Sequence, residues 1–180
     1  MLNIDTISKG FGSQELLTET GFQINPGERV GLVGRNGHGK TTLLNMIAGT
    51  DSPDEGKITL PSGYRMGMLS QKIRFSHGTV IEEAVAGLGI QETGQTWKAE
   101  KILSGLGFSL ADMNRDPAEF SGGYQVRLNL AKVLVSEPDL LMGHAQLDPR
   151  AFQHDHRIAA PVPPDQLIPI GPEHRRPVAP

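Results

Sequence analysis

The 180-residue chain contains no cysteine. It can therefore form neither a disulfide framework nor a thiolate metal site, and its composition is compatible with a reducing cytosol. No apolar run approaches the roughly 20 residues that a membrane-spanning helix needs. The N-terminus also lacks the basic region and apolar core of a secretory signal. We therefore expect a cytoplasmic protein without membrane insertion.

Net charge is also small, because 17 Lys and Arg residues nearly balance 20 Asp and Glu residues, for a formal net charge of −3. A domain that attracts nucleic acid over its whole surface is usually basic. The composition therefore gives no direct evidence for a nucleic-acid partner, although it leaves room for a local basic patch. The length predicts one domain with a small appendage.

What the chain does contain is a glycine-rich stretch, Gly34–Thr42, that reads Gly-Arg-Asn-Gly-His-Gly-Lys-Thr-Thr. It fits G-x-x-x-x-G-K-[ST], the phosphate-binding loop of nucleotide triphosphatases. Residues 28–33 before it resemble a short buried strand, and residues 42–48 after it resemble a helix that ends at Gly49. This strand–loop–helix context favours nucleotide binding over a plain glycine-rich turn.

The chemistry of the loop predicts how it would hold phosphate. Glycines let backbone N–H groups approach the phosphate oxygens, and the start of the helix adds a positive dipole end. Lys40 would reach the β- and γ-phosphates, and the Thr41 hydroxyl would bind Mg²⁺. His38 fills a free position of the motif, so we expect an exposed side chain without a chemical role. The candidate binding residues of the loop are Gly34, Asn36, Gly37, Gly39, Lys40, Thr41 and Thr42.

Local patterns predict the surrounding elements. Thr79–Glu82 fits a capping box, which predicts a helix to about Ala86, and residues 97–103 predict another helix. The predicted strands span residues 2–6, 22–24, 57–60, 65–69 and 138–142. Together with the phosphate loop, these elements predict an α/β domain with a central, mostly parallel sheet and antiparallel strands near the N-terminus.

A second motif, Phe120-Ser121-Gly122-Gly123, opens a long amphipathic helix. A serine and two glycines at a helix start can form a second anion site, although on their own they would be an ordinary helix cap. Arg127 and Lys132 would point towards solvent or a partner. The predicted apolar face of the helix consists of Val126, Leu130, Val133 and Leu134.

With both motifs in view, the chain resembles the ATP-binding cassette (ABC) ATPases. The phosphate loop, Ser70-Gln71 as a glutamine loop and the Ser121-Gly122-Gly123 signature carry the resemblance, and residues 101–108 and 127–132 look specifically like the ABC-F subfamily. The resemblance covers residues 1–142. It implies a P-loop fold that has a helical subdomain at 72–135 and is incomplete at its C-terminus.

The resemblance implies ATP and Mg²⁺ as ligands and roles for individual residues. Phe11 would stack on adenine, the alternative being a plain core or edge aromatic. Gln71 would be a catalytic residue near Mg²⁺ and the attacking water, the alternative being a polar strand end. Ser121 and Gly123, with Gly122 between them, would contact the γ-phosphate held by a second ABC ATPase domain in a head-to-tail dimer.

The resemblance also implies a translation-associated role, with the ribosome as a partner. The segment between Gln71 and the signature is short compared with family members that carry a long helical arm there. That difference weakens any carry-over of arm contacts with the ribosome.

The chain departs from the family pattern after residues 138–142. There the family continues into an Asp-Glu pair that supports Mg²⁺ and polarises the attacking water, followed by a switch histidine. Here His144 and Ala145 stand at about those positions. Asp139 lies at the start of the strand, more than ~10 Å too early to replace them. We therefore expect nucleotide binding with impaired hydrolysis.

Composition also changes at this point, since eight of the 13 prolines and four of the six histidines lie in residues 143–180. We expect an irregular tail, in which His154, His156 and His174 have no framework to aim them at a metal or a phosphate. A truncated or frameshifted gene is the hypothesis that the break suggests.

Two other functions stay open. The first is the ATP-binding subunit of an ABC membrane transporter, against which the ABC-F-like stretch at 103–108 argues. The second is a non-catalytic interaction protein that uses its tail as a ligand. Only Pro161–Pro164 supports it, and this segment lacks a convincing proline-recognition motif.

Overall fold

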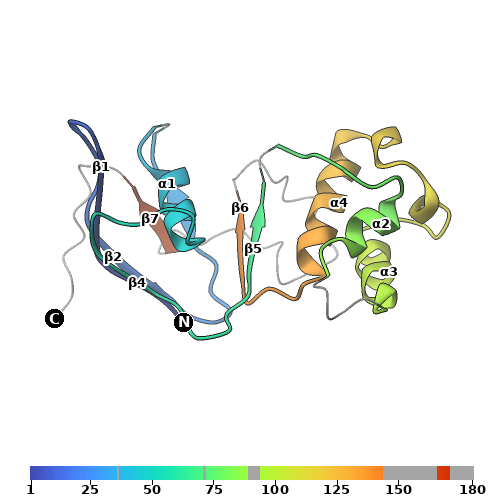
Figure 1. The fold of residues 1–180 in the computed structure, drawn as a ribbon, viewed down its shortest axis with the longest axis horizontal. Coiled ribbons are helices and arrows are strands. Elements are labelled where there is room, and N and C mark those ends of the chain that lie inside the picture. Colours follow the sequence, from blue (N-terminus) through green and yellow to red (C-terminus); the bar gives the residue numbers. More distant parts are fainter. Residues whose placement is uncertain (36, 71, 89–93, 144–165, 171–180) are drawn as a thin grey trace. The chain divides into compact units, whose positions relative to one another are not determined.

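The computed structural model describes residues 1–35, 37–70, 72–88, 94–143 and 166–170 (Figure 1). The chain divides into two compact units. The first contains Met1–Tyr64 and Val162–Pro180, and the second contains Arg65–Pro161. The second unit thus begins before residue 72, where the helical part was predicted to start, because a strand at 66–69 packs with the helices that follow it.

The first unit contains an antiparallel sheet in the order β2-β1-β4. Its strands are β1 (Leu2–Phe11), β2 (Gln14–Ile24) and β4 (Glu55–Thr59). The β1–β2 register runs from Leu2–Ile24 to Phe11–Gln14. Leu2 and Ile4 are buried, as the alternation of apolar residues in a strand requires, and Ile7 is buried as well because the register shifts between Ile4 and Ile7. The predicted N-terminal antiparallel pair is confirmed and is longer than its apolar alternation indicated.

The same unit contains a parallel pair of strands next to a helix. Strand β3 (Gly31–Val33) leads through the glycine-rich loop into α1 (Lys40–Ile47), and β7 (Leu167–Pro169) pairs with β3. The prediction of an irregular tail is therefore wrong at residues 167–169.

Strand β7 includes Pro169, which has no N–H to donate to a neighbouring strand. Successive residues of a strand point their N–H groups to opposite sides. The Ile170 N–H donates to the Val33 carbonyl at 2.7 Å, so the neighbouring residue, Pro169, needs no donor on the β3 side. Ile168 and Ile170 are buried, so the burial of two apolar side chains favours the pairing of this short segment.

In its described residues, the second unit consists of a parallel strand pair and three helices. Strand β5 (Met66–Leu69) pairs with β6 (Leu140–Gly143) from Met66–Leu140 to Leu69–Gly143. The helices are α2 (Val80–Val85), α3 (Thr96–Gly105) and α4 (Gly122–Leu134), with short 3-10 turns η2 (Asp112–Asn114) and η3 (Pro117–Glu119). Parallel pairing of strands was predicted, and both units contain it.

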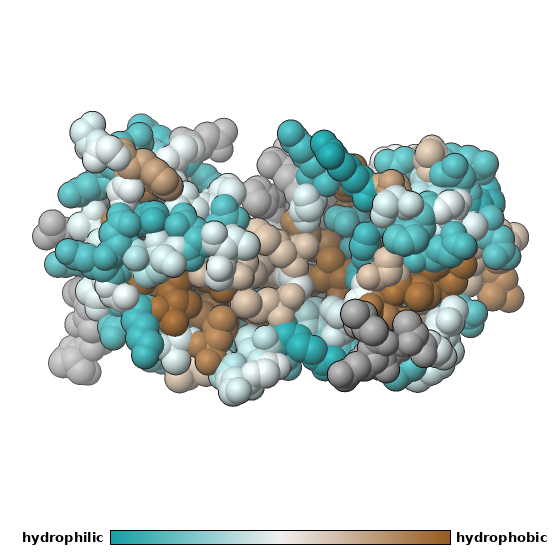
Figure 2. Space-filling view, viewed as in Figure 1, coloured by the Kyte–Doolittle hydropathy of each residue, from teal (hydrophilic) through white to brown (hydrophobic). Residues whose placement is uncertain are grey.

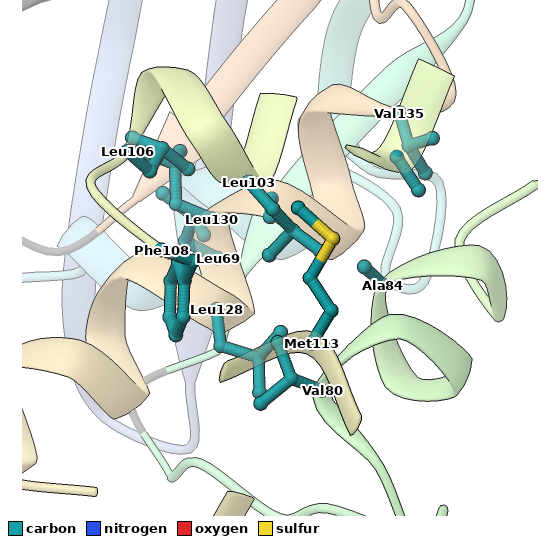
Figure 3. Packing of buried hydrophobic residues seen from close by; sticks show 12 residues of the cluster. Leu69, Val80, Ala84, Leu103, Leu106, Phe108, Met113, Leu128, Leu130 and Val135 are labelled. Carbon is teal, nitrogen blue, oxygen red and sulfur yellow. The ribbon is translucent and has the colours of Figure 1, made fainter. Parts of the chain in front are cut away.

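One apolar core holds the second unit together (Figure 3). It joins all three helices to β5, and Figure 3 shows the Phe108 ring and the Met113 thioether among the leucine side chains. The buried residues of this core are Leu69, Val80, Ala84, Ala99, Leu103, Leu106, Phe108, Met113, Leu128, Leu130, Ala131 and Val135.

Helix α4 buries more than the predicted face. Leu130 of that face is buried, and Val126, Val133 and Leu134 are half-buried, but Leu128 and Ala131, outside the predicted face, are buried as well. The reason is that α4 contacts α2, α3, η3 and β5. A helix that is covered on several sides does not show a single apolar stripe.

Both strand pairs leave apolar side chains exposed. Val33 and Leu167 are exposed on the β3–β7 pair, and Met66 and Met68 on the β5–β6 pair. Figure 2 shows apolar surface on the visible face of the molecule. Each described helix is too short or too polar to cross a lipid bilayer.

Candidate functional site

The glycine-rich loop needs glycine at several positions for reasons internal to the fold. Gly37 and Gly39 have φ values of +83° and +82°, which side chains other than glycine rarely adopt. A Cβ on Gly39 would also lie 3.2 Å from the Leu16 Cβ, and one on Gly34 would clash with the Ile170 carbonyl oxygen. The loop path therefore depends on these three glycines.

Lys40 lies across this loop. Its Nζ donates to the Gly34 carbonyl at 2.7 Å and to the Arg35 carbonyl at 2.8 Å. The ammonium is thereby held at the inner side of the turn, at the first residue of α1. That first turn contains no acidic residue and its cap, Gly39, has no side chain. A positive charge and the donor end of a helix thus meet at one place, which suits a polyphosphate.

The candidate threonine ligands of Mg²⁺ lie in the first turn of α1. Thr41 is exposed and Thr42 half-buried in the first turn of α1. A threonine hydroxyl is an oxygen ligand of the kind that Mg²⁺ takes, usually together with phosphate oxygens. Among the described residues there is no cluster of three or more Asp, Glu, His or Cys that could hold a metal ion alone. The site therefore fits Mg²⁺ only as a partner of a phosphate. Asn36 and Gln71 lie outside the described residues.

Phe11 ends β1 in the same unit as the phosphate loop. Its side chain is 58% exposed, so it is not a core aromatic. Gly12, with a φ of +60°, turns the chain into β2 directly after it. The Lys9 ammonium lies 5.5 Å from the centre of the Phe11 ring. An exposed ring in the same unit as the phosphate loop can stack on a nucleotide base.

The signature motif lies in the second unit at the start of α4. Ser121 is the N-cap residue, but its hydroxyl makes no capping hydrogen bond. Ser121, Gly122 and Gly123 are all exposed. A Cβ on either glycine would meet no atom within 4 Å, and neither has a positive φ. Unlike the loop glycines, these two are not required by the packing of the chain.

The segment before the signature is held firmly. The Gln125 side-chain amide donates to the Phe120 carbonyl at 3.0 Å. Phe120 packs against Phe108 and Tyr124, with ring centres 5.6 and 5.8 Å apart. Arg127 lies over the Tyr124 ring and donates to the Leu106 carbonyl, so it does not point simply towards solvent as predicted. The exposed Ser-Gly-Gly turn therefore projects from an ordered base.

A buried charge network joins α2 to α4, and the sequence motifs did not indicate it. Glu83 is fully buried. It accepts hydrogen bonds from the Lys132 ammonium, from the backbone of Ser76 and from the backbone and ring of His77. Burial alone would raise the pKa of Glu83, but the bond from Lys132 and those from Ser76 and His77 lower it to about 2.

This network also corrects the prediction for Lys132, which was expected to face solvent or a partner. Its ammonium binds Glu83 instead. The contact ties the segment that follows residue 71 to the signature helix. Local sequence patterns could not predict this ion pair, because Glu83 and Lys132 are 49 residues apart in the chain.

Asp139 has a structural place at the start of β6. Its Oδ2 accepts from the Arg65 backbone N–H at 2.9 Å, and its own N–H donates to the Arg65 carbonyl at 2.8 Å. These bonds join the beginnings of β5 and β6, at the opposite end of the strand from Gly143. His144 and Ala145 lie outside the described residues, as do His154, His156 and His174.

A cavity of about 400 Å³ lies elsewhere, between β5 and α4 in the second unit. Lys72, Arg74 and Lys132 contribute to its lining with two methionines, Met66 and Met68. It contains no residue of the phosphate loop, so it is not the predicted nucleotide site.

Comparisons with known proteins place these features in a family. Residues 17–143 match the family described as ABC transporter. The Escherichia coli K12 protein "Probable ATP-binding protein YheS" is 33% identical over 159 residues, which cover 83% of this chain and 24% of that protein. "Energy-dependent translational throttle protein EttA" of the same organism is 34% identical over 145 residues, which cover 79% of this chain and 26% of that protein.

A plant relative carries the subfamily name. "ABC transporter F family member 2" of Arabidopsis thaliana is 29% identical over 211 residues, covering 90% of this chain and 31% of that protein. The chain thus spans about a quarter to a third of the length of these relatives, at 24% to 31%.

Solved structures agree on the fold. The ATP-binding cassette MJ1267 of an ABC transporter has a TM-score of 0.72 at 24% identity, covering 86% of this chain and 75% of that one. The dimeric bacterial cassette MJ0796 has a TM-score of 0.66 at 19% identity, and the match covers 95% of this chain and 88% of that one. These likenesses confirm the predicted α/β P-loop fold class.

Proposed function

The chain belongs to the ABC transporter family, with ABC-F proteins among its relatives, and we propose that it binds Mg²⁺-ATP at Gly34–Thr42 and hydrolyses it poorly. The observation that carries the proposal is the position of Lys40. Its ammonium is held inside a loop whose glycines have the left-handed conformation that brings backbone N–H groups together.

Each loop residue has a defined part in this function. Lys40 would exchange its bonds to the Gly34 and Arg35 carbonyls for phosphate oxygens, keeping a charge-assisted contact in either state. The N–H groups at the start of α1 would donate to the same phosphates. The Thr41 hydroxyl would orient Mg²⁺, which supplies positive charge to the phosphate oxygens when it is bound.

Impaired hydrolysis follows from the residues after β6. Strand β6 ends at Gly143, and the sequence continues with His144 and Ala145 instead of two carboxylates. A carboxylate that polarises the attacking water contributes on the order of 10²–10⁴-fold to the rate. Gln71 alone would orient that water without removing its proton. The chain would therefore act by binding and releasing nucleotide.

The proposed partner is a second ABC ATPase domain in a head-to-tail dimer. Ser121, Gly122 and Gly123 are exposed, and the packing of the chain itself does not require them. They would approach the γ-phosphate held by the loop of the other domain. A dimeric cassette of the same fold supports this arrangement. Likeness to the translational throttle protein supports a translation-associated role, with the ribosome as a partner and a cytoplasmic location.

Nucleotide binding is tested by titrating the full chain with a fluorescent ATP analogue in Mg²⁺. We expect Lys40→Ala to weaken binding by about tenfold or more, because it removes a charge-assisted bond of about 1.5–3 kcal/mol. The matched control is Lys57→Ala, an exposed lysine on β4 of the same unit. Equal affinities of wild type and Lys40→Ala would refute the proposal.

Impaired hydrolysis is tested by restoring the carboxylates. We expect His144→Asp/Ala145→Glu to raise the steady-state ATPase rate by at least about 10²-fold, while His144→Asp alone leaves it near the wild-type value. Nucleotide affinity should stay unchanged in both variants. A wild-type chain that already hydrolyses ATP as fast as the double variant would contradict the proposal.

A further inference from the structure

The side chains of Lys9 and Phe11 lie on the same face of β1, because residues two apart in a strand share a face. The Lys9 ammonium lies 5.5 Å from the centre of the Phe11 ring. Phe11 is nevertheless 58% exposed, whereas the lysine side chain is only 12% exposed. An exposed aromatic ring thus has a largely covered cation next to it.

Three acceptors fix this cation in place. The Lys9 Nζ donates to the Ser52 carbonyl at 2.7 Å, to Asp54 Oδ1 at 3.1 Å and to Asp51 Oδ1 at 3.2 Å. An ammonium has three N–H donors, and all three are used here. Lys9 therefore has no donor left for a phosphate group. Its hydrogen bonds to Asp54 and Asp51 raise its pKa, which keeps it charged.

The anchoring segment is itself bound to β1. The Asp54 N–H donates to the Ser8 carbonyl at 2.9 Å, and Asp54 Oδ2 accepts from the Gly10 N–H at 2.9 Å. Residues 8, 9 and 10 are thus all joined to the same short turn. Five polar contacts thus set the position of the ammonium next to the Phe11 ring: three to the ammonium itself and two that join the turn to β1.

We propose that Lys9 is a positioning residue for recognition of the nucleotide base: fixed by Asp51, Asp54 and Ser52, it holds one face of Phe11 and leaves the other to stack on a purine. The proposal rests on the proposed nucleotide binding at the phosphate loop. An exposed phenylalanine without this contact would sample several rotamers, and restricting it to one on binding would cost conformational entropy and weaken affinity. A cation on one face limits that motion and draws ring electrons to its own side.

The test compares ATP with inorganic tripolyphosphate, which has the phosphates but no base. Each ligand displaces a fluorescent ATP analogue from the full chain. The dissociation constant of tripolyphosphate divided by that of ATP reports how much the base contributes to affinity. We expect Lys9→Met to lower this ratio about two- to fivefold, the range of an exposed cation–aromatic contact. Tripolyphosphate affinity should not change, and Lys9→Arg should keep most of the ratio.

A double-mutant cycle with Phe11→Ala separates positioning from a structural role. In the Phe11→Ala background we expect Lys9→Met to have no further effect on the ratio, since its action passes through the ring. Equal effects of Lys9→Met in both backgrounds, or loss of ATP and tripolyphosphate affinity together, would overturn the proposal. Failure of the wild type to bind either ligand would instead refute nucleotide binding itself.

Discussion

Replacement of Glu83 by Gln should remove most of the stability that the charge network gives to the second unit. Glu83 is fully buried between α2 and α4 and accepts hydrogen bonds from Lys132, Ser76 and His77. Gln is similar in shape but neutral, and it can accept with only one oxygen. The Lys132 ammonium would then lie partly buried beside a group without charge, which is costly.

The pKa of Glu83 sets the size of this effect. It is about 2 in the folded chain against an ordinary value of 4.5. One pKa unit corresponds to about 1.4 kcal/mol, so the ionised carboxylate contributes on the order of 3 kcal/mol to the free energy of unfolding. Because the folded-state pKa is the lower one, the contribution is present above about pH 4.5 and is lost as the pH falls towards 2.

Urea unfolding of the full chain, followed by the fluorescence of Trp97, measures this directly. Trp97 is the single tryptophan and lies on α3 in the second unit. We expect Glu83→Gln to lower the free energy of unfolding by about 3 kcal/mol at pH 7 and to flatten its pH dependence between about pH 4.5 and 2. The control, Glu82→Gln, changes the adjacent exposed carboxylate of the capping box and should cost under about 1 kcal/mol. The same acid dependence in wild type and Glu83→Gln would refute the reasoning.

Further predictions concern the two glycine motifs and the capping box, all read from the unfolding midpoint. Gly39→Ala should destabilise the first unit by about 1–2 kcal/mol, because its φ is +82° and Leu16 lies close by; unchanged stability would contradict it. Gly122→Ala should change stability by less than about 0.5 kcal/mol, because a Cβ there meets nothing. Thr79→Ala should cost about 1 kcal/mol through loss of the bond from the Glu82 N–H; Thr79→Ser should restore most of it.

Features decided within a few residues could be predicted from the sequence. The capping box is an example, since Thr79 and Glu82 exchange bonds of 3.1 and 3.3 Å across three residues. Gly34–Thr42 is another, because its glycines, lysine and helix start are contiguous. Their positions in the structure agree with a strand–loop–helix motif.

Features that depend on distant pairing could not be predicted. Strand β7 pairs with β3 although Leu167 and Gly31 are far apart in the sequence, and Pro169 opposed a strand on local grounds. The orientation of Lys132 depends on Glu83, and that of Lys9 on Asp51 and Asp54. Local patterns identify which side chains are charged or apolar, but the burial of a charge is decided only by what the fold places next to it.

The two glycine motifs differ in what requires their glycines. In the phosphate loop, Gly37 and Gly39 have positive φ values, and Gly34 approaches the Ile170 carbonyl too closely for a Cβ. These glycines serve the path of the chain as well as any ligand. At the signature, Gly122 and Gly123 have ordinary φ values and open space around them. Larger residues would fit there without strain, and serine and alanine favour a helix more than glycine does. Folding alone therefore does not require glycine at these two positions, which supports the proposed contact of the signature with a second ATPase domain.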